Sequence, residues 1–306
     1  MKNWTTKDIP SQTGKLAVIT GATGGLGFET ALALAGADAE VILTGRNAQK
    51  GQDALRRIRA EHPQAKVRFD ALDLVSLASV ADFSSRLNAE ARPIDLLINN
   101  AGVMALATRQ VTADGFEKQL GTNYLGHFAL TARLLPLLCG ARVVNLSSIA
   151  HRNGRINFDD LQGERRYRPW AIYAQSKLAM LMFALELQRR SDAMGWGITS
   201  IAAHPGWART ELIANGPGAK GFLGVMSQFV APFFSHSAAA GALPILFAVT
   251  APEAKAAGYY GPGGFEEMKG PVAPAQIMPQ AIDAAVAARL WDVSAQLTGA
   301  EWTQKA

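Results

Sequence analysis

Tyr173 and Lys177 stand four residues apart in the segment Tyr173-Ala-Gln-Ser-Lys177, and this spacing puts both side chains on one face of a helix. A phenol and an ammonium group on one face can share a proton network, which is the chemistry of a general acid or base. By itself the pair is weak evidence, because a half-buried tyrosine beside a solvated lysine also arises by chance. Its meaning depends on what the rest of the chain places around it.

A glycine-rich turn, Thr20-Gly-Ala-Thr-Gly-Gly-Leu-Gly27, lies between a short apolar run and a helical pattern of small residues. Gly21, Gly25 and Gly27 let the backbone turn tightly and approach a pyrophosphate at the helix N-terminus, where free N–H groups favour negative charge. The spacing differs from the dinucleotide fingerprint G-x-G-x-x-G. A glycine turn without a ligand is the alternative, but the strand-turn-helix context favours a dinucleotide site.

The tip of the second predicted strand reads Thr44-Gly45-Arg46, where an NAD-binding chain usually offers a carboxylate to the ribose 2′-OH. Glu40 lies at the other end of this strand, so the tip has no carboxylate. Arg46 can instead bind a 2′-phosphate through charge-assisted hydrogen bonds, although a solvated arginine at a helix start would look the same. The sequence therefore predicts that NADP(H) is preferred, with NAD possible.

Polar residues also follow two further predicted strands. Asp73-Leu74 comes after the third strand, where a carboxylate can contact adenine, and Asn99-Asn100-Ala101-Gly102 ends the fourth. Each alone could be an ordinary turn. In an open α/β sheet the ligand binds at the carboxyl ends of the strands, so their common placement indicates one cofactor site.

Short apolar strands alternate with helices along the chain. Strands are predicted at residues 16–20, 40–44, 67–69, 94–98, 142–146 and 198–203, and helices at residues up to 35 and at 47–61, 77–87, 112–138, 170–194, 237–249 and 279–297. This spacing predicts an α/β fold, a doubly wound Rossmann-type parallel sheet with helices on both faces. Residues 1–306 are predicted to form a single domain, with a cofactor and catalytic core at about 14–210 and a substrate lid and C-terminal helices at about 211–306.

Composition narrows the class of protein. Of the 306 residues 49% are hydrophobic and 18% are charged, so the chain can fill a large core. Lysines and arginines number 30 against 25 acidic residues, but they are spread out, and a nucleic-acid partner is not indicated. Residues 1–11 are polar and show no secretory signal, and the longest apolar stretch, about 221–234, is too short to span a bilayer. The single cysteine, Cys139, fits a reducing compartment, and a cytoplasmic location without an integral membrane segment or metal site is predicted.

Taken together, these motifs resemble the short-chain dehydrogenase/reductase superfamily over about residues 14–210. The family pattern is carried by Thr20-Gly21-x-x-x-Gly25-x-Gly27, Asn99-Asn100-Ala101-Gly102, Asn123, Ser147-Ser148, Tyr173-x-x-x-Lys177 and Pro205-Gly206. The chain is most similar to the retinol dehydrogenase-like branch, through Asn123-Tyr-Leu-Gly-His-Phe128, Val144-Asn-Leu-Ser-Ser-Ile-Ala-His151, Leu161-Gln-Gly163, His204-Pro-Gly-Trp-Ala-Arg-Thr210 and Tyr259-Tyr-Gly-Pro262.

The resemblance implies a role for each matching residue. Tyr173 would be the general acid, Lys177 would lower its pKa and hold the nicotinamide ribose, and Ser148 would donate a hydrogen bond to the substrate oxygen. Asn123 would sit at a break in the helix predicted at 112–138 and hold a water that relays protons to Lys177. The residues expected to bind the cofactor are Gly21, Thr23, Gly25, Leu26, Gly27, Arg46, Asp73, Leu74, Asn100, Ala101, Gly102, Tyr173, Lys177, Pro205 and Gly206.

Two neighbouring choices arise in this site. Ser147 and Ser148 point to opposite faces if the strand continues, and Ser148 is chosen because the family generally uses the second serine of such a pair. Tyr167 is excluded because Ala171, not a lysine, follows four residues later.

The segment at about 151–168 lengthens the spacing from Ser148 to Tyr173 beyond that of compact family members. It could block the interface through which many relatives pair, cover the active site, or be a solvated loop. A homodimer and a monomer therefore both remain open.

Residues 222–234 are rich in phenylalanine, leucine, valine and methionine. They could form a hydrophobic lid over a bulky alcohol, aldehyde or ketone, pack against the core, or contact a membrane surface. The main hypothesis is an NADP-dependent oxidoreductase acting on a small hydrophobic alcohol or carbonyl compound. The alternatives are a catalytically silent nucleotide sensor or scaffold on the same fold, and an epimerase or dehydratase that uses bound cofactor transiently.

Overall fold

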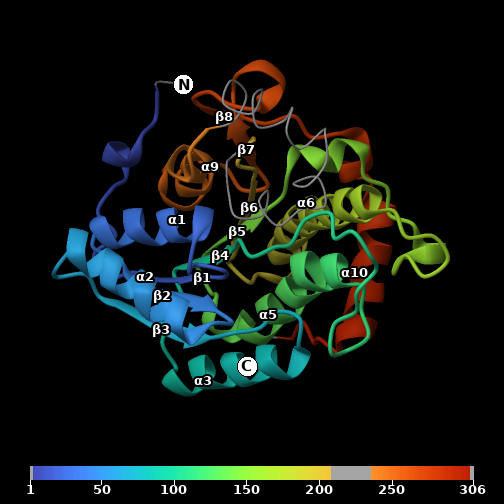
Figure 1. Cartoon of the computed structure of the whole chain (residues 1–306), viewed down its shortest axis with the longest axis horizontal. Coiled ribbons are helices and arrows are strands. Elements are labelled where there is room, and N and C mark those ends of the chain that lie inside the picture. Colours follow the sequence, from blue (N-terminus) through green and yellow to red (C-terminus); the bar gives the residue numbers. More distant parts are fainter. Residues whose placement is uncertain (1–2, 208–235, 304–306) are drawn as a thin grey trace.

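One sheet of eight strands runs through the centre of the protein in the order β3-β2-β1-β4-β5-β6-β7-β8 (Figure 1). The structure is a computed structural model that describes residues 3–207 and 236–303. β7 and β8 are antiparallel, whereas the other neighbouring strands are parallel. The strands are β1 (Leu16–Ile19), β2 (Glu40–Gly45), β3 (Val67–Ala71), β4 (Leu96–Asn99), β5 (Arg142–Leu146), β6 (Thr199–Ala203), β7 (Tyr259–Pro262) and β8 (Val272–Pro274).

Helices cover both faces of the sheet, so the predicted fold class is confirmed. The helices are α1 (Gly25–Gly36), α2 (Ala48–Glu61), α3 (Leu77–Glu90), α4 (Lys118–Leu120), α5 (Gly126–Leu134), α6 (Pro169–Met194), α9 (Ala238–Thr250) and α10 (Ala284–Thr298). One apolar cluster joins a sheet face to α1, α2 and α9, and the other joins the opposite face to α3, α5, α6 and α10. Along β1 the side chains alternate between the two clusters, with Val18 in one and Ile19 in the other.

The strand register brings the carboxyl ends of the central strands to one edge of the sheet. Ile19 pairs with Ile98, Asn99 with Asn145, and Leu146 with Ala203. The segments that follow these strands therefore meet at that edge, where a ligand of an open α/β sheet binds.

The helix predicted at 112–138 is interrupted, so that prediction is wrong in its extent. Val111 and Glu117 pair in an antiparallel bridge, and the helix begins only at α4. A π-helical turn, Gly121–Leu125, separates α4 from α5, and a 3₁₀ turn, Leu135–Leu137, follows α5. Apolar periodicity continues through such turns and does not reveal them.

Two close tertiary contacts lie at and directly after the π-helical turn. A Cβ on Gly126 would lie 2.6 Å from the Leu74 carbonyl oxygen, so the helix passes very close to the chain after β3. The Asn123 side chain bonds the backbone of Val103, with Oδ1 accepting from the amide at 2.7 Å and Nδ2 donating to the carbonyl at 3.0 Å. A local change of helical pitch is a common way to aim a functional side chain.

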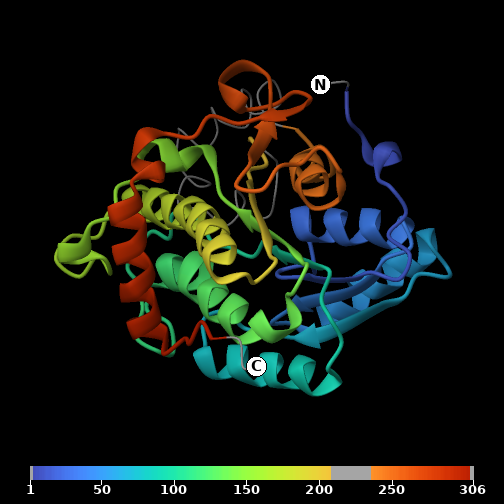
Figure 2. The ribbon, with the colours of Figure 1, turned by 180° about the vertical axis from the view of Figure 1, so that it is seen from behind.

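The last part of the chain differs most from the sequence prediction. β7 and β8 are not predicted as strands, and the helix predicted at 279–297 is a 3₁₀ turn, Pro279–Ile282, followed by α10. Figure 2 shows α10, in red, crossing beside α6 and α5. Trp291 of α10 packs edge-on to Phe128 of α5, with ring centroids 5.1 Å apart, and the Arg190 guanidinium of α6 lies 4.5 Å from the Trp291 ring centre.

The long segment before α6 is anchored to the protein at several points, although residues 164–166 within it are exposed. Gln175 of α6 bonds it twice, accepting from the Asn157 amide at 2.9 Å and donating to the Leu161 carbonyl at 3.0 Å. Leu161 is buried, and the Tyr167 hydroxyl donates to the Leu106 carbonyl at 2.8 Å. Tyr167 therefore fastens the segment to the loop after β4.

Candidate active site

The turn between β1 and α1 has a shape that requires glycine. Gly21 and Gly25 have φ values of +65° and +54°, in the left-handed region. A Cβ on Gly27 would lie 2.4 Å from the Gly21 carbonyl oxygen. α1 begins after Gly24, which has no side chain to cap the first N–H groups of the helix. The glycine turn and the N-terminus of α1 together fit a pyrophosphate, which would accept hydrogen bonds from the free N–H groups of the helix.

Thr20 ties the glycine turn to the end of β4. Its hydroxyl oxygen accepts from the amides of Asn100 at 2.8 Å and Ala101 at 2.9 Å, and its carbonyl accepts from Asn100 Nδ2 at 2.8 Å. Asn99 points away from the turn and bonds Asn145 and Thr131 within the protein. Asn100 and Ala101 are thus at the predicted cofactor site, and Asn99 is behind it.

The tip of β2 also lies at the glycine turn, because the Ala22 amide donates to the Thr44 carbonyl at 3.0 Å. Thr23 lies against Gly45, where an added Cβ would be 3.0 Å from Thr23 Cγ2. Arg46 follows at once and its side chain is exposed. Leu26 is buried in the first turn of α1.

Two carboxylates, Glu40 and Asp73, belong to or follow the strands β2 and β3. Glu40 starts β2 and is paired with Arg92 at 2.6 Å, at the opposite end from Arg46. Asp73 is half-buried after β3, where its Oδ1 accepts from the Val75 amide at 3.2 Å, and Leu74 beside it is buried.

Tyr173 and Lys177 lie one turn apart on α6, next to the end of β5. Lys177 Nζ donates to the Leu146 carbonyl at 3.0 Å, and both side chains are largely buried. The Ser148 hydroxyl lies near the Tyr173 phenol and acts to lower its pKa. Ser147 turns away and donates to the Lys177 carbonyl at 2.8 Å. Of the two serines, Ser148 is therefore the one beside Tyr173.

Asn123 approaches the same group from the π-helical turn. Its Nδ2 donates to Ser176 Oγ at 2.9 Å, and Ser176 donates to the Tyr173 carbonyl at 2.8 Å. A Cβ on Gly102 would lie 3.1 Å from Asn123 Oδ1 and 3.5 Å from Lys177 Nζ. Gly102 therefore lets the loop after β4 pass directly over these residues.

Pro205 and Gly206 follow β6 at the same edge of the sheet. Gly206 has a φ of +66°, and an added Cβ would lie 2.4 Å from the Met268 carbonyl oxygen. The apolar segment 222–234, predicted to be a lid, lies outside the described residues. The structure thus gathers the predicted site residues from the glycine turn to Gly206 along one edge.

Comparisons with known proteins agree with this geometry. The sequence profile of the short chain dehydrogenase family matches residues 15–217. The chain is 41% identical to polyprenol dehydrogenase of Mus musculus over 299 residues, covering 95% of this chain and 86% of the relative. It is 42% identical to retinol dehydrogenase 13 of Homo sapiens over 296 residues, covering 94% and 86%. An uncharacterized protein from Mycobacterium paratuberculosis, known from a crystal structure, is 40% identical in sequence and superposes with a TM-score of 0.80. The match covers 98% of this chain and 99% of that protein.

The chain is a short-chain dehydrogenase/reductase of the retinol dehydrogenase-like branch. It is therefore an NAD(P)-dependent oxidoreductase that acts on CH–OH groups. In the described ranges of this dehydrogenase, no helix is both long and apolar enough to cross a membrane. Nor do residues 3–207 and 236–303 contain a group of three or more His, Cys, Asp or Glu side chains arranged to hold a metal ion.

Burial sets the protonation of the central pair in this dehydrogenase. Desolvation lowers the pKa of Lys177 from 10.5 to about 8 and raises the pKa of Tyr173 from its usual value of 10, while the neighbouring Ser148 hydroxyl opposes the rise. The Tyr173 phenol therefore holds its proton at neutral pH. The lowering of the Tyr173 pKa by Lys177 stays a prediction.

His127 is buried near the candidate active site, and the sequence motifs do not predict a role for it. Its Nδ1 donates to the Asn123 carbonyl at 3.0 Å, which leaves Nε2 to accept from the Thr20 hydroxyl at 2.8 Å. Burial lowers the pKa of His127 to about 4, so the ring is neutral. His127 thereby connects the glycine turn to the π-helical turn. His127 lies within the Asn123–Phe128 motif, and that position is the only feature of the sequence that points to it.

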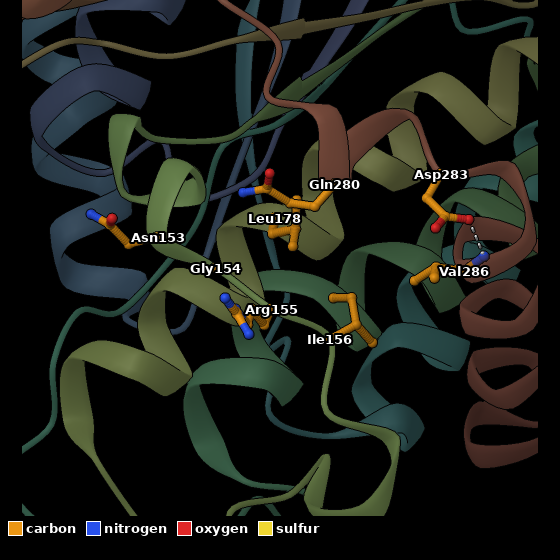
Figure 3. A pocket seen from close by; sticks show the side chains of 8 residues that line it. All are labelled: Asn153, Gly154, Arg155, Ile156, Leu178, Gln280, Asp283 and Val286. Carbon is orange, nitrogen blue, oxygen red and sulfur yellow. Dashed lines mark hydrogen bonds between the residues drawn. The ribbon is translucent and has the colours of Figure 1, made fainter.

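A cavity of about 490 Å³ lies away from these residues, between the segment before α6 and the start of α10 (Figure 3). Its polar side chains serve the fold, since Asp283 caps α10 through the Ala285 and Val286 amides at 3.0 Å. Gln280 donates to the Arg152 carbonyl at 2.9 Å. None of the predicted site residues lines this cavity, so the cavity is separate from the candidate active site.

The buried Lys177 predicts an unusual dependence of stability on pH. Its pKa is about 8 in the folded enzyme and near 10.5 when exposed, so the unfolded chain binds more protons between these values and stability rises with pH there. Lys177→Met removes this group. The wild type should therefore gain stability relative to Lys177→Met as the pH rises. The difference in unfolding free energy, Lys177→Met minus wild type, should fall by about 3 kcal/mol from pH 8 to pH 10.5, at about 1.4 kcal/mol for each pH unit.

Urea unfolding of both proteins at several pH values, in the absence of cofactor, measures this difference. Titration of other groups cancels because it affects both proteins alike. A difference that is constant across the window would contradict the buried, perturbed Lys177.

Proposed function

We propose that the enzyme prefers NADP(H) and interconverts a hydrophobic alcohol and its aldehyde or ketone, with Tyr173 as the general acid and base. The observation that carries this proposal is the burial of Tyr173 and Lys177 one turn apart on α6, with Lys177 Nζ bonded to the end of β5 just before Ser148. The cytoplasmic location and the monomeric or dimeric state stay predictions.

The residues divide the chemistry among them. When bound, the nicotinamide supplies or accepts the hydride. Tyr173 gives its phenolic proton to the carbonyl oxygen in reduction and takes it back in oxidation. Ser148 donates a hydrogen bond to the same oxygen as negative charge develops. Lys177, whose ammonium is within a turn of the phenol, stabilises the phenolate that remains, and Asn123 stands behind it to hold a relay water.

The preference for NADP(H) rests on the tip of β2. Arg46 is exposed there beside Thr23 and Gly45, and the nearest acidic residue of the strand, Glu40, is paired with Arg92 at the far end. An exposed guanidinium at this position can make bidentate contacts with a 2′-phosphate. A ribose hydroxyl, by contrast, would find no carboxylate at this end of β2.

A hydrophobic substrate is supported by Trp170. Its side chain is 61% exposed, although it is large and apolar, and its ring stands edge-on to the Tyr173 ring with centroids 6.1 Å apart. It therefore offers an apolar surface next to the reacting phenol. The relatives described above are named for polyprenol and retinol, both apolar alcohols.

The silent sensor or scaffold is the weaker proposal, because such a protein has no need for both Tyr173 and Lys177. An epimerase or dehydratase would form product without net consumption of NADPH. A turnover assay that follows both NADPH and product separates these functions from the proposed one.

Tyr173→Phe should lower kcat for carbonyl reduction by about 10²- to 10⁴-fold, because the phenolic proton is lost. NADPH affinity should change little, since the ring remains. A panel of apolar aldehydes and ketones with NADPH gives kcat, and fluorescence titration gives the affinity. If the wild type is inactive on the whole panel and Tyr173→Phe changes nothing, the sensor is favoured.

Arg46→Ala should raise KM for NADPH by about tenfold to a hundredfold, as expected for the loss of a charged hydrogen bond of about 1.5–3 kcal/mol. KM for NADH should stay within twofold. Arg56→Ala is the matched control, because Arg56 is also an exposed arginine, on α2, and pairs with Asp53. Equal effects of Arg46→Ala on both cofactors would remove Arg46 from 2′-phosphate binding.

Trp170→Ala should raise KM for long apolar alcohols by about tenfold, which corresponds to the loss of about 1.4 kcal/mol of apolar burial. Short alcohols that do not reach Trp170 should be unaffected, and Trp170→Phe should restore most of the affinity. Met194→Ala is the control, since Met194 is 66% exposed at the other end of α6. A KM that rises equally for alcohols of every length would argue against a substrate contact.

A further inference from the structure

The β7–β8 hairpin, at the top of Figure 1, closes over the segment that follows β6. The His204 amide donates to the Tyr260 carbonyl at 2.9 Å, and the Trp207 amide donates to the Met268 carbonyl at 2.8 Å. An added Cβ on Gly261 would lie 1.9 Å from His204 Nε2, so β7 requires glycine where the imidazole crosses it. The hairpin is thus shaped to hold the His204-Pro205-Gly206 segment.

Glu267, near the tip of the hairpin, uses both of its carboxylate oxygens. Oε2 accepts from His204 Nε2 at 3.0 Å and forms an ion pair with Arg152 Nη2 at 2.9 Å, while Oε1 accepts from the Gln276 amide at 2.8 Å. The side chain is only 15% exposed. One carboxylate oxygen therefore joins two segments that are far apart in the sequence.

The first of these segments leads to the cofactor. His204 is fully buried, and its Nδ1 accepts from the Gly206 amide at 3.1 Å, which leaves the proton on Nε2 for Glu267. The ring is thereby fixed at both nitrogen atoms. Two hydrogen bonds, one at each nitrogen of the His204 ring, therefore link Glu267 to the backbone of Gly206.

The second segment leads to Ser148. Arg152 belongs to the 3₁₀ turn Ile149–Asn153, which Ser148 begins by accepting from the Ala150 amide with its hydroxyl at 3.2 Å. His151 Nδ1 donates to the Ser148 carbonyl at 2.7 Å. The position of the Arg152 guanidinium is therefore transmitted through one short turn to Ser148.

The backbone at the hairpin tip is strained in a way that fits a functional task. Glu266 and Glu267 are consecutive non-glycine residues with φ values of 49° and 56°, in the left-handed region. Arg152 pairs with both, through Nη1 to Glu266 Oε2 and Nη2 to Glu267 Oε2, each at 2.9 Å. Such strain persists where surrounding contacts over-determine it, and it concentrates at functional sites.

The charge states of Glu267, His204 and Arg152 stabilise these contacts. Burial favours a higher pKa for Glu267, but the hydrogen bonds from His204 and Gln276 and the charge of Arg152 lower it to about 2. Burial lowers the pKa of His204, whose ring is accordingly neutral. The Glu267 carboxylate is thus ionised and faces one permanent cation, Arg152, and two neutral donors, the His204 ring and the Gln276 amide.

We propose that Glu267 is a positioning residue that holds the Ser148 turn and the Pro205–Gly206 segment at a fixed distance, through Arg152 and His204 respectively. This inference rests on the proposed roles of Ser148 at the substrate oxygen and of Pro205–Gly206 at the cofactor. The two segments carry the two reactants, so their separation sets the geometry of hydride transfer. Neither Glu267 nor Arg152 touches the reacting atoms in this role.

The test compares Glu267→Gln with Glu266→Gln. Glutamine keeps the length of Glu267 but has a single oxygen, which cannot accept from Gln276, His204 and Arg152 together. Glu267→Gln should lower kcat by about 10- to 100-fold, the cost of a misplaced reactant, and raise the Kd for NADPH by about three- to tenfold. KM for the alcohol should change less than twofold.

Glu266→Gln is the matched control, because Glu266 shares the backbone conformation and the partner Arg152 but is 62% exposed and does not contact His204. It should leave kcat and Kd within twofold of the wild type. Arg152→Gln combined with Glu267→Gln should be little worse than the more severe single variant, as expected for residues acting through one contact. Assays are made at a temperature at which circular dichroism shows every variant folded.

Glu267→Gln with kcat and Kd both within twofold of the wild type, even with a lower Tm, would overturn the proposal and leave Glu267 a purely structural residue. If Glu267→Gln does not fold, Arg152→Gln makes the same comparison, with the same expected and contrary results. If the wild type turns over none of the alcohols, the proposed function fails, whereas the NADPH affinities still decide the role of Glu267.

Discussion

One hydroxyl group, on Thr20, holds the cofactor side and the catalytic side of this dehydrogenase together. It accepts from the amides that follow β4 and donates to His127, whose other nitrogen bonds the carbonyl of Asn123. Three segments that are separate in the sequence thus share one buried oxygen atom. Because buried polar groups are costly to leave unpaired, each segment fixes the others.

The parallel part of the fold follows readily from the sequence. β1, β2 and β4 are short apolar runs that end in polar or glycine residues, and this pattern is strong because both faces of the sheet are buried. The site residues are predictable for a related reason. Most of them follow the ends of parallel strands or lie one turn apart on α6, whereas Asn123 lies in the π-helical turn.

The parts that escaped prediction depend on contacts between distant residues. β7 and β8 are four and three residues long and contain glycine or proline, so they gain strand structure only from their neighbours. The π-helical turn ends directly before Gly126, which packs against the chain after β3. Glu267 and Arg152 likewise lack any common motif, and only the folded chain brings them into contact.

Two features at or beside the candidate site lower the stability of the folded chain. Lys177 is buried with its pKa lowered, and the hairpin keeps two glutamates in a left-handed backbone conformation. Both features act against folding, and both lie at or beside the candidate site. Such local conflict is expected where function constrains a sequence, and the large apolar clusters on the two sheet faces offset it.

The packing of α10 has a consequence for how copies of this chain can meet. Phe128 and Phe183, on α5 and α6, are covered by Trp291 and Trp302 from the C-terminal part of the same chain. These rings have no apolar surface left to share, since both are almost completely buried. A second molecule that approached α5 and α6 from this side would meet the outer surface of α10, with its own exposed residues, as the recognition surface.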